Sequence, residues 1–355
     1  MSKIGVWNTA FLGDAILTLP LLQTLRTAFP EAEIDFWVRK GFASLFSAHP
    51  AVTNVYEYDK RGRDRGLMRS FRLGHALGNQ RYALWISAHS SFRSGLIARW
   101  SSAKTRIGYD KPACNSWFYT HMVPRKFFEL EEIERLNQLL LPLELEQRGM
   151  TPETWPEIVV PSDALDDAER YFSALMEEKD APVLGLHPGS IWGTKRWPLE
   201  YYARVAARAA SEGAHVLVFG GPGEEERMAS VVAAAAKETA GAGAGALIRN
   251  LAGKLSLPGL AAYIGRLSCY ATNDSGPMHL AWPQRVPVTA MFGPTVRSLG
   301  FFPRGENAAV MELPMDCRPC GLHGPQTCPL GHHKCMRDMI PDMVWGDIAK
   351  KLFKN

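Results

Sequence analysis

This chain of 355 residues has few cysteines, a small net charge and few long apolar runs. Six cysteines are too few for the disulfide-rich scaffold of a small secreted protein. A formal net charge of +4 does not predict binding to nucleic acid or another polyanion, so any such site must depend on a local cluster. Composition therefore indicates an ordinary globular protein.

One segment superficially resembles a leader or membrane anchor. Between Ile4 and Gln23 the only charged residue is Asp14. An aspartate near the middle of a membrane span costs about 2.5–3.5 kcal/mol, and no cleavage site of small residues is evident. We expect a strand, a turn and a helix instead, in a cytoplasmic protein without an anchor.

Short apolar segments alternate with helical patterns, which is typical of parallel sheets covered by helices on both faces. Prolines cluster in residues 151–161 and predict a boundary between domains 1–160 and 161–355. The expected fold is α/β, with two Rossmann-like doubly wound domains that bind ligands at the carboxyl ends of their strands. The expected strands are 3–7, 33–38, 54–58, 82–87, 183–187, 214–219, 268–272 and 287–292; the expected helices are 14–28, 66–78, 129–146, 163–178, 199–211, 224–239, 257–266 and 341–353, with a flexible loop at 240–246.

Two polar stretches follow strands of the predicted sheets. In residues 8–14, Gly13 would permit a tight turn and Asp14 would begin a helix, either as a cap or as a general base. Residues 187–198 (HPGSIWGTKRWP) contain Ser190 and Lys195 in a glycine-containing loop. Backbone N–H groups and cations suit an anion, although an ordinary surface loop is the alternative.

Two more stretches occupy the same kind of position. In residues 219–227 (FGGPGEEER), an acid after a strand could hold a ribose, or the glutamates could simply begin a helix. In residues 272–282 (TNDSGPMHLAW), a strand ends at Asn273 and we expect a helix that carries His279 one turn in. The amides of Ser275 and Gly276 would suit a phosphate, while Asp274 as a cap and His279 as a core residue are the alternatives.

Together, residues 11–26 (FLGDAILTLPLLQTLR), 187–198, 272–281 and 292–295 (FGPT) resemble the ADP-heptose:lipopolysaccharide heptosyltransferases, glycosyltransferase family 9. Residues 36–40 (FWVRK) and the cysteine-rich tail look most like the heptosyltransferase II branch. The resemblance implies the GT-B fold, in which two Rossmann-like domains face a cleft, with the acceptor on the N-terminal domain and the nucleotide sugar on the C-terminal one. It also implies an inverting reaction that needs no metal ion and no cofactor.

The resemblance also implies roles for individual residues. Asp14 matches the base for the acceptor hydroxyl, and Lys195 matches the lysine that neutralises the departing diphosphate. Fixed cations and amides are what such a leaving group needs when no metal is used. The other residues expected at the donor are Thr9, Gly13, Ser190, Glu225, Asp274, Ser275, Gly276 and His279.

A basic run lies between Lys60 and Arg72. It could be a solvated face or a surface for an anionic partner. The partners implied are ADP-heptose and an acceptor of lipid A with a Kdo inner core, so we expect Arg61 and Arg63 to bind the acceptor and the run to contact the cytoplasmic face of the inner membrane. Because Phe71 is the only aromatic residue within the run, nucleic acid is not expected as a partner.

Four cysteines lie close together at Cys317, Cys320, Cys328 and Cys335. The spacing C-x2-C-x7-C-x6-C only partly matches a zinc site. A structural metal, reduced thiols and a disulfide therefore all remain open, and the proposed chemistry depends on none of them.

Overall fold

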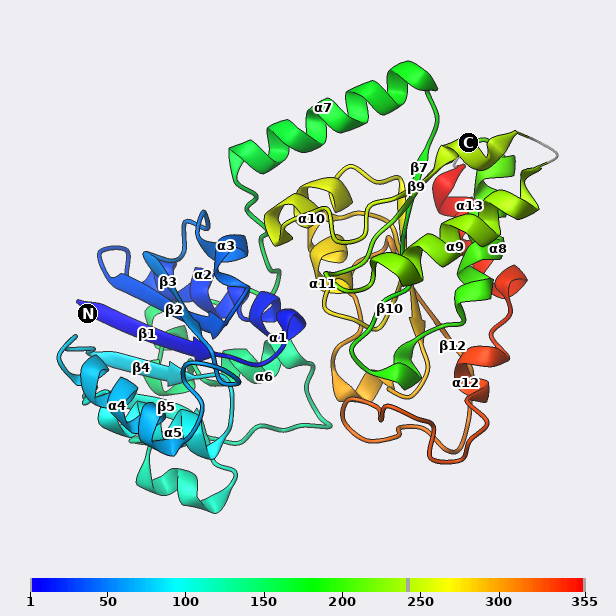
Figure 1. Ribbon diagram of the computed structural model, residues 1–355. Coiled ribbons are helices and arrows are strands. Elements are labelled where there is room, and N and C mark those ends of the chain that lie inside the picture. Colours follow the sequence, from blue (N-terminus) through cyan, green and yellow to red (C-terminus); the bar gives the residue numbers. More distant parts are fainter. Residues whose placement is uncertain (1, 241–242, 354–355) are drawn as a thin grey trace. The chain divides into compact units, whose positions relative to one another are not determined.

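The computed structural model describes residues 2–240 and 243–353 (Figure 1). The chain divides into two compact units, Met1–Val159 and Val160–Asn355. The division falls in the proline-rich stretch. Part of this stretch packs on the N-terminal unit, where the backbone N–H of Glu153 donates to Thr24 Oγ1 at 2.9 Å.

Within the described residues, the N-terminal unit contains a six-stranded parallel sheet in the order β3-β2-β1-β4-β5-β6. The order reverses at β1, so the switch point of the sheet lies between the carboxyl ends of β1 and β4. The strands are β1 (Lys3–Asn8), β2 (Glu33–Arg39), β3 (Asn54–Tyr58), β4 (Leu84–Ser87), β5 (Thr105–Tyr109) and β6 (His121–Val123). The helices are α1 (Leu12–Leu17), α2 (Leu19–Ala28), α3 (Ala43–Phe46), α4 (Leu67–Gly78), α5 (Phe92–Trp100) and α6 (Glu132–Gln138).

The C-terminal unit repeats this plan with a parallel sheet in the order β12-β11-β10-β7-β8-β9. Here the switch point lies between the carboxyl ends of β7 and β10. The strands are β7 (Val183–His187), β8 (His215–Val218), β9 (Ile248–Asn250), β10 (Cys269–Asn273), β11 (Val288–Phe292) and β12 (Ala308–Glu312). The helices are α7 (Ser162–Glu178), α8 (Leu199–Ser211), α9 (Glu225–Glu238), α10 (Leu257–Ile264), α11 (Met278–Ala281), α12 (Lys334–Arg337) and α13 (Pro341–Leu352).

Each sheet is buried on both faces, which explains why the central strands are almost continuously apolar. In the N-terminal unit, Trp7, Trp37 and Trp85 stack across the sheet and are nearly inaccessible to solvent. In the C-terminal unit, small alanines let α8 lie close to the sheet, and Trp345 of α13 joins the same core. Among the helices that are described, none has both the length and the hydropathy that a bilayer span requires.

The predicted helix 14–28 is wrong, because the chain breaks into α1 and α2 at Thr18. Pro20 has no N–H to continue the ladder of hydrogen bonds. At the break the Thr18 N–H donates to the carbonyl of Ala15 at 3.2 Å. The carbonyl of Asp14 therefore accepts instead from Thr18 Oγ1 at 2.8 Å and from Asn8 Nδ2 at 3.1 Å. Gly13 lies within α1 and has no positive φ, so the predicted tight turn at this residue is also wrong.

Two other predicted helices are shorter than expected. The helix predicted over 129–146 ends at Gln138 and continues as 3-10 turns at Leu141–Leu143 and Glu146–Arg148, since Pro142 cannot extend it. The helix expected to carry His279 is only the four residues of α11, which lies between Pro277 and Pro283. Of the loop expected at 240–246, residues 241–242 lie outside the described part and Ala244–Leu247 is a 3-10 helix.

Candidate active site

In the N-terminal unit, polar residues gather at the switch point between β1 and β4. Thr9 follows β1 and His89 follows β4, and Thr9 Oγ1 lies 3.3 Å from His89 Nδ1. Thr9 is buried, and burial lowers the pKa of His89 to about 4, assisted by the positive charges of Lys60 and Arg125. His89 is therefore neutral at physiological pH and presents a hydrogen-bonding ring next to Thr9.

Asp14 lies in the first turn of α1, next to this group. Its Oδ2 accepts a hydrogen bond from the backbone N–H of Phe11 at 3.1 Å. Burial raises the pKa of Asp14 from 3.8 to about 6, and the negative charge of Glu132 raises it further, while the Phe11 N–H and Arg125 oppose the rise. A carboxylate with a pKa just below neutrality is ionised at pH 7 and still basic enough to take a proton, as a general base requires.

A buried ion network on α6 and the preceding loop lies close to Asp14. Arg125 Nη2 donates to both carboxylate oxygens of Glu132, at 3.0 and 3.2 Å. Arg135 Nε donates to Glu132 Oε2 at 2.7 Å, and both Glu132 and Arg135 are buried. Helix α1 packs against α6, so this network supports the helix that carries Asp14 and also sets the charge around it.

Cationic side chains converge on the same edge of the sheet. Lys60 follows β3, and its Nζ reaches back to donate to the carbonyl of Thr9 at 3.1 Å. Burial lowers the pKa of Lys60, and the charges of Arg39, Arg61 and Arg93 lower it further. These four cations are thus close enough to repel one another, which an anionic ligand would relieve.

The two arginines predicted from the basic run are placed differently. Arg61 is exposed and lies near the cations around Lys60. Arg63 is directed to Asp64, with Nε 3.2 Å from Oδ1 and Nη2 3.2 Å from Oδ2. Lys60, His89 and Arg93 were not predicted as site residues, because only strand order brings them to Thr9 and Asp14.

In the C-terminal unit, Asn273 at the end of β10 connects the two strands of the switch point. Its Nδ2 donates to the carbonyl of Pro188 at 2.8 Å, and its Oδ1 accepts from the backbone N–H of Trp197 at 3.0 Å. Both partners lie in the loop at 188–198 that follows β7. Asn273 therefore fixes the two ends of the loop that carries Lys195.

Lys195 and Asp274 form an ion pair at this position. Lys195 Nζ lies 2.5 Å from Asp274 Oδ2, and the side chains are only 11% and 7% exposed. Asp274 Oδ2 also accepts from Thr295 Oγ1 at 2.6 Å. The site thus holds a largely buried ammonium group on Asp274, whose carboxylate is itself held by Thr295, and a positioned ammonium group is suited to a phosphate oxygen.

Ser275 and Gly276 form a turn directly after Asp274. Both are partly accessible, and within the described part of the chain neither backbone N–H donates a hydrogen bond. The ring of His279 is buried, and burial lowers its pKa to about 4, although the charge of Asp274 opposes this. Since the indole N–H of Trp282 donates to His279 Nδ1 at 3.1 Å, the proton of this neutral ring is on Nε2, which can donate.

Two glutamates lie at the start of α9. Glu225, the predicted ribose ligand, is exposed, and backbone N–H groups at Gly223 and Glu225 lower its pKa. Glu224 accepts from the backbone N–H of Gly221 at 2.9 Å, and its carboxylate lies against Gly189. Ser190 follows Gly189 and accepts from Arg196 Nε through its carbonyl at 2.7 Å. The carboxylate of Glu225 lies instead against Gly253, so the two glutamates face different loops.

The cysteine-rich segment, residues 317–335, supports both donor loops. His333 Nε2 donates to the carbonyl of Thr194 at 2.8 Å, and Thr194 Oγ1 donates to the carbonyl of Pro325 at 2.6 Å. Arg318 Nη2 donates to the carbonyl of Thr295 at 2.6 Å. Thr194 precedes Lys195 and Thr295 contacts Asp274, so the segment holds both partners of the ion pair in place.

The cysteines are free thiols in this structure. Within the residues that are described, no three His, Cys, Asp or Glu side chains are arranged to hold a metal ion. Burial raises the pKa of Cys335 to about 11, and the nearby thiols of Cys320, Cys317 and Cys328 contribute to this rise. The contribution of this segment to the site is therefore through its backbone and through His333 and Arg318.

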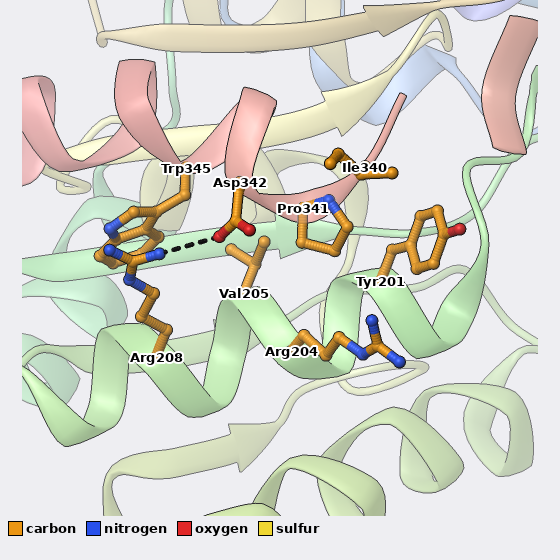
Figure 2. Close-up of a pocket in the computed structure, with 8 residues that line it drawn as sticks. All are labelled: Tyr201, Arg204, Val205, Arg208, Ile340, Pro341, Asp342 and Trp345. Carbon is orange, nitrogen blue, oxygen red and sulfur yellow. Dashed lines mark hydrogen bonds and ion pairs between the residues drawn. The ribbon is translucent and has the colours of Figure 1, made fainter. Parts of the chain in front are cut away.

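A pocket of about 230 Å³ lies elsewhere in the C-terminal unit, between α8 and the start of α13 (Figure 2). Arg208 donates to Asp342 at 3.1 Å and covers the ring of Trp345, with 4.9 Å between the guanidinium carbon and the ring centroid. None of the predicted site residues lines it. Arg208 and Asp342 pair across the two helices, which fits helix packing better than ligand binding.

Two Rossmann-like units in tandem are the architecture of the GT-B class of glycosyltransferases. Comparison with known protein families identifies the family within this class. The chain belongs to glycosyltransferase family 9 (heptosyltransferase), whose model matches residues 70–326.

Individual relatives agree with this family. The chain is 28% identical to lipooligosaccharide heptosyltransferase 2 of Campylobacter jejuni over 358 residues, covering 99% of each chain. It is 29% identical to lipopolysaccharide heptosyltransferase 1 of Pseudomonas aeruginosa over 335 residues, covering 90% of this chain and 86% of that protein. Among solved structures, ADP-heptose lps heptosyltransferase II of E. coli matches with a TM-score of 0.79 and 25% identity, covering 100% of this chain and 99% of the other. The resemblance and the GT-B fold expected from the sequence are confirmed.

Proposed function

We propose that this protein is an inverting, metal-independent glycosyltransferase that moves L-glycero-D-manno-heptose from ADP-heptose to the inner core of lipopolysaccharide. The observation that carries the proposal is the buried pair Lys195–Asp274, with Nζ 2.5 Å from Oδ2, beside the open N–H groups of Ser275 and Gly276. The Lys195 ammonium group and these N–H groups supply positioned donors where a diphosphate would leave. The names of the relatives supply the donor and the class of acceptor.

The C-terminal unit binds ADP-heptose. Lys195 and the Ser275–Gly276 amides contact the diphosphate, and His279 donates from Nε2 to a phosphate or to the sugar. Ser190 lies in the same loop as Lys195, and Glu225 holds the ribose. Because a lysine ammonium and backbone amides neutralise the leaving diphosphate, the step requires no Lewis acid.

The N-terminal unit binds the acceptor and carries the base. Asp14 takes the proton of the acceptor hydroxyl as its oxygen attacks the anomeric carbon of heptose. The bond from that carbon to the diphosphate breaks, and ADP leaves with the electron pair. Attack from the side opposite the diphosphate inverts the anomeric centre. Thr9 and Gly13 lie beside Asp14, where we place them near the donor phosphates.

The cation cluster of the N-terminal unit faces the anionic groups of the acceptor. Arg39, Lys60, Arg61 and Arg93 influence one another electrostatically, and Lys60 is partly buried. Carboxylates of Kdo and phosphates of lipid A relieve this repulsion. Arg63 joins them only if it exchanges Asp64 for an acceptor anion, so it is the weaker of the two predicted acceptor residues.

We infer that the second heptose is added, since the relatives covered along their full length are named heptosyltransferase 2. Addition of the first heptose, or use of another nucleotide-diphosphate sugar, is the alternative, and a heptosyltransferase 1 is similarly close in identity. Such an enzyme acts in the cytoplasm, at the inner membrane that holds its acceptor. Nucleic acid is not a partner in this proposal.

The proposal is tested by transfer from ADP-heptose to two acceptors, Kdo2-lipid A and its monoheptosylated form, with EDTA present. Product on the monoheptosylated acceptor alone is the expected result. Product on Kdo2-lipid A alone would assign the first heptose instead. Loss of activity in EDTA, restored by a divalent cation, would refute metal independence. No transfer to either acceptor, with ADP still bound, would refute the assigned sugar or acceptor.

A further inference from the structure

Helix α4 presents three large apolar side chains to solvent. Leu67, Met68 and Phe71 are 56%, 66% and 38% exposed. Ser70, Gly74 and Leu77 of the same helix are buried in the N-terminal unit. Leu67 and Met68, more than half exposed, contribute little to the attachment of α4 to its own core, and their position requires another explanation.

The apolar surface continues onto α5, which packs along α4 (Figure 1). The rings of Phe71 and Trp100 meet edge to face with 4.8 Å between centroids, and Trp100 is itself 38% exposed. The helices lie close because Gly74 has no side chain: a Cβ there would be 2.7 Å from Cβ of Trp100. The patch formed by Leu67, Met68, Phe71 and Trp100 thus lies on two closely packed helices.

Arginines surround this patch. Arg65, Arg69 and Arg72 are exposed, and within the described ranges none of them forms an ion pair. Arg99 lies over the ring of Trp100, with 5.9 Å from the guanidinium carbon to the centroid. The only acid in the basic run, Asp64, is already paired with Arg63. The charge around the apolar patch is therefore positive and uncompensated.

Exposed apolar side chains next to exposed arginines indicate what kind of surface this patch binds. The cores of protein–protein interfaces are depleted of charge, whereas here the arginines alternate with the apolar side chains on one helix. Apolar tips that enter the acyl region, with arginines at the level of the phosphates, are typical of a helix that lies in a membrane interface. The tryptophan at the edge of the patch is also typical of that depth.

We propose that α4 and the end of α5 dock onto an anionic phospholipid surface. Leu67 and Met68 enter below the headgroups, and Arg65, Arg69 and Arg72 contact lipid phosphates. The inference rests on the proposed function only in that a lipid-anchored acceptor gives the docking a purpose; vesicle binding itself needs neither sugar nor acceptor.

The test is flotation of the full-length protein with vesicles that contain no acceptor, made of phosphatidylethanolamine with phosphatidylglycerol or of phosphatidylcholine alone. We compare the wild type with the double variant Leu67→Ser/Met68→Ser. The matched control is Leu165→Ser/Met343→Ser, which removes the same two residue types from exposed positions on α7 and α13. Folding of each variant is checked by thermal unfolding.

The expected result is binding to the anionic vesicles only, weakened about tenfold or more in Leu67→Ser/Met68→Ser and unchanged in the control, because two apolar side chains no longer enter the lipid. Equal binding to both kinds of vesicle would overturn the role of the arginines. Wild-type binding by Leu67→Ser/Met68→Ser, or no vesicle binding by the wild type, would overturn the proposal.

Activity separates docking from catalysis. Leu67→Ser/Met68→Ser should lose transfer to acceptor embedded in vesicles and keep transfer to a deacylated, water-soluble acceptor. Equal loss on both would place the defect in catalysis and overturn the docking role. If the wild type transfers heptose to neither acceptor but still floats with anionic vesicles, the proposed function fails and the docking surface stands.

Discussion

Replacement of Asp14 by asparagine should remove activity while leaving the protein as stable as before or more so. Asparagine has the same shape and can still accept the hydrogen bond that Asp14 Oδ2 receives from the Phe11 N–H at 3.1 Å. It cannot take a proton, so kcat should fall about 10²–10⁴-fold, the usual contribution of a general base. Binding of ADP-heptose should not change, since Asp14 acts on the acceptor.

The stability effect follows from the raised pKa. A rise from 3.8 to about 6 means that ionised Asp14 destabilises the folded state by up to about 3 kcal/mol, at about 1.36 kcal/mol per pKa unit. This cost is absent below the ordinary pKa of 3.8 and is complete above the folded pKa of about 6. Asp14→Asn should therefore be more stable than the wild type above pH 6 and equal to it in acid.

Two measurements check this reasoning. Denaturant unfolding across the pH range compares wild type, Asp14→Asn and the control Asp163→Asn, which changes an exposed aspartate in the first turn of α7. The pH dependence of kcat/KM for the wild type should fall as pH drops below about 6, where Asp14 takes up its proton. Normal turnover by Asp14→Asn would refute the base, and a loss of stability at alkaline pH would refute the argument from burial.

Three further predictions concern the C-terminal unit. Lys195→Ala should lower kcat and weaken ADP binding about 10- to 100-fold, as loss of a charged hydrogen bond does; calorimetry showing unchanged ADP affinity would contradict direct contact with the diphosphate. In His333→Asn the new residue tolerates the positive φ of 48° but cannot reach the Thr194 carbonyl. ADP binding should therefore weaken about three- to tenfold, recover in the longer His333→Gln and stay normal in the control His332→Asn. Equal ADP affinities in all three variants would rule out a positioning role for His333. Glu225→Gln should weaken ADP binding about tenfold and leave pyrophosphate binding unchanged, whereas Glu224→Gln should change neither affinity. Weaker ADP binding in Glu224→Gln and normal ADP binding in Glu225→Gln would assign the ribose to Glu224.

Elements whose apolar spacing is strong were predicted closely from the sequence. The strand over 183–187 and the helix over 199–211 have the predicted bounds, because burial on both faces of a parallel strand, or on one face of a helix, leaves a clear local pattern. The partly buried edge strand over 54–58 also has the predicted bounds, because Val55, Tyr56 and Tyr58 are residues that favour strands. The strand β5 and the short outer strands β6, β9 and β12 were not predicted. They are only partly buried, so their composition does not differ enough from that of a loop.

The candidate site was predictable only where a motif is contiguous. The stretch around Asp274, Ser275 and His279 is local, and so is the loop that contains Lys195. The pairing of Lys195 with Asp274 and the bracing of both loops by residues 317–335 join segments far apart in the chain. No local pattern encodes such contacts.

By itself, the sequence determined the fold class, the family and the residue types that phosphate chemistry requires, because hydrophobic periodicity and contiguous motifs are local properties. The tertiary structure alone decided which groups meet. Strand order placed His89 beside Thr9, and burial raised the pKa of Asp14. The packing of α4 on α5 left Leu67 and Met68 facing solvent. Proximity and desolvation depend on how distant segments pack, so these features arise only when the chain is folded.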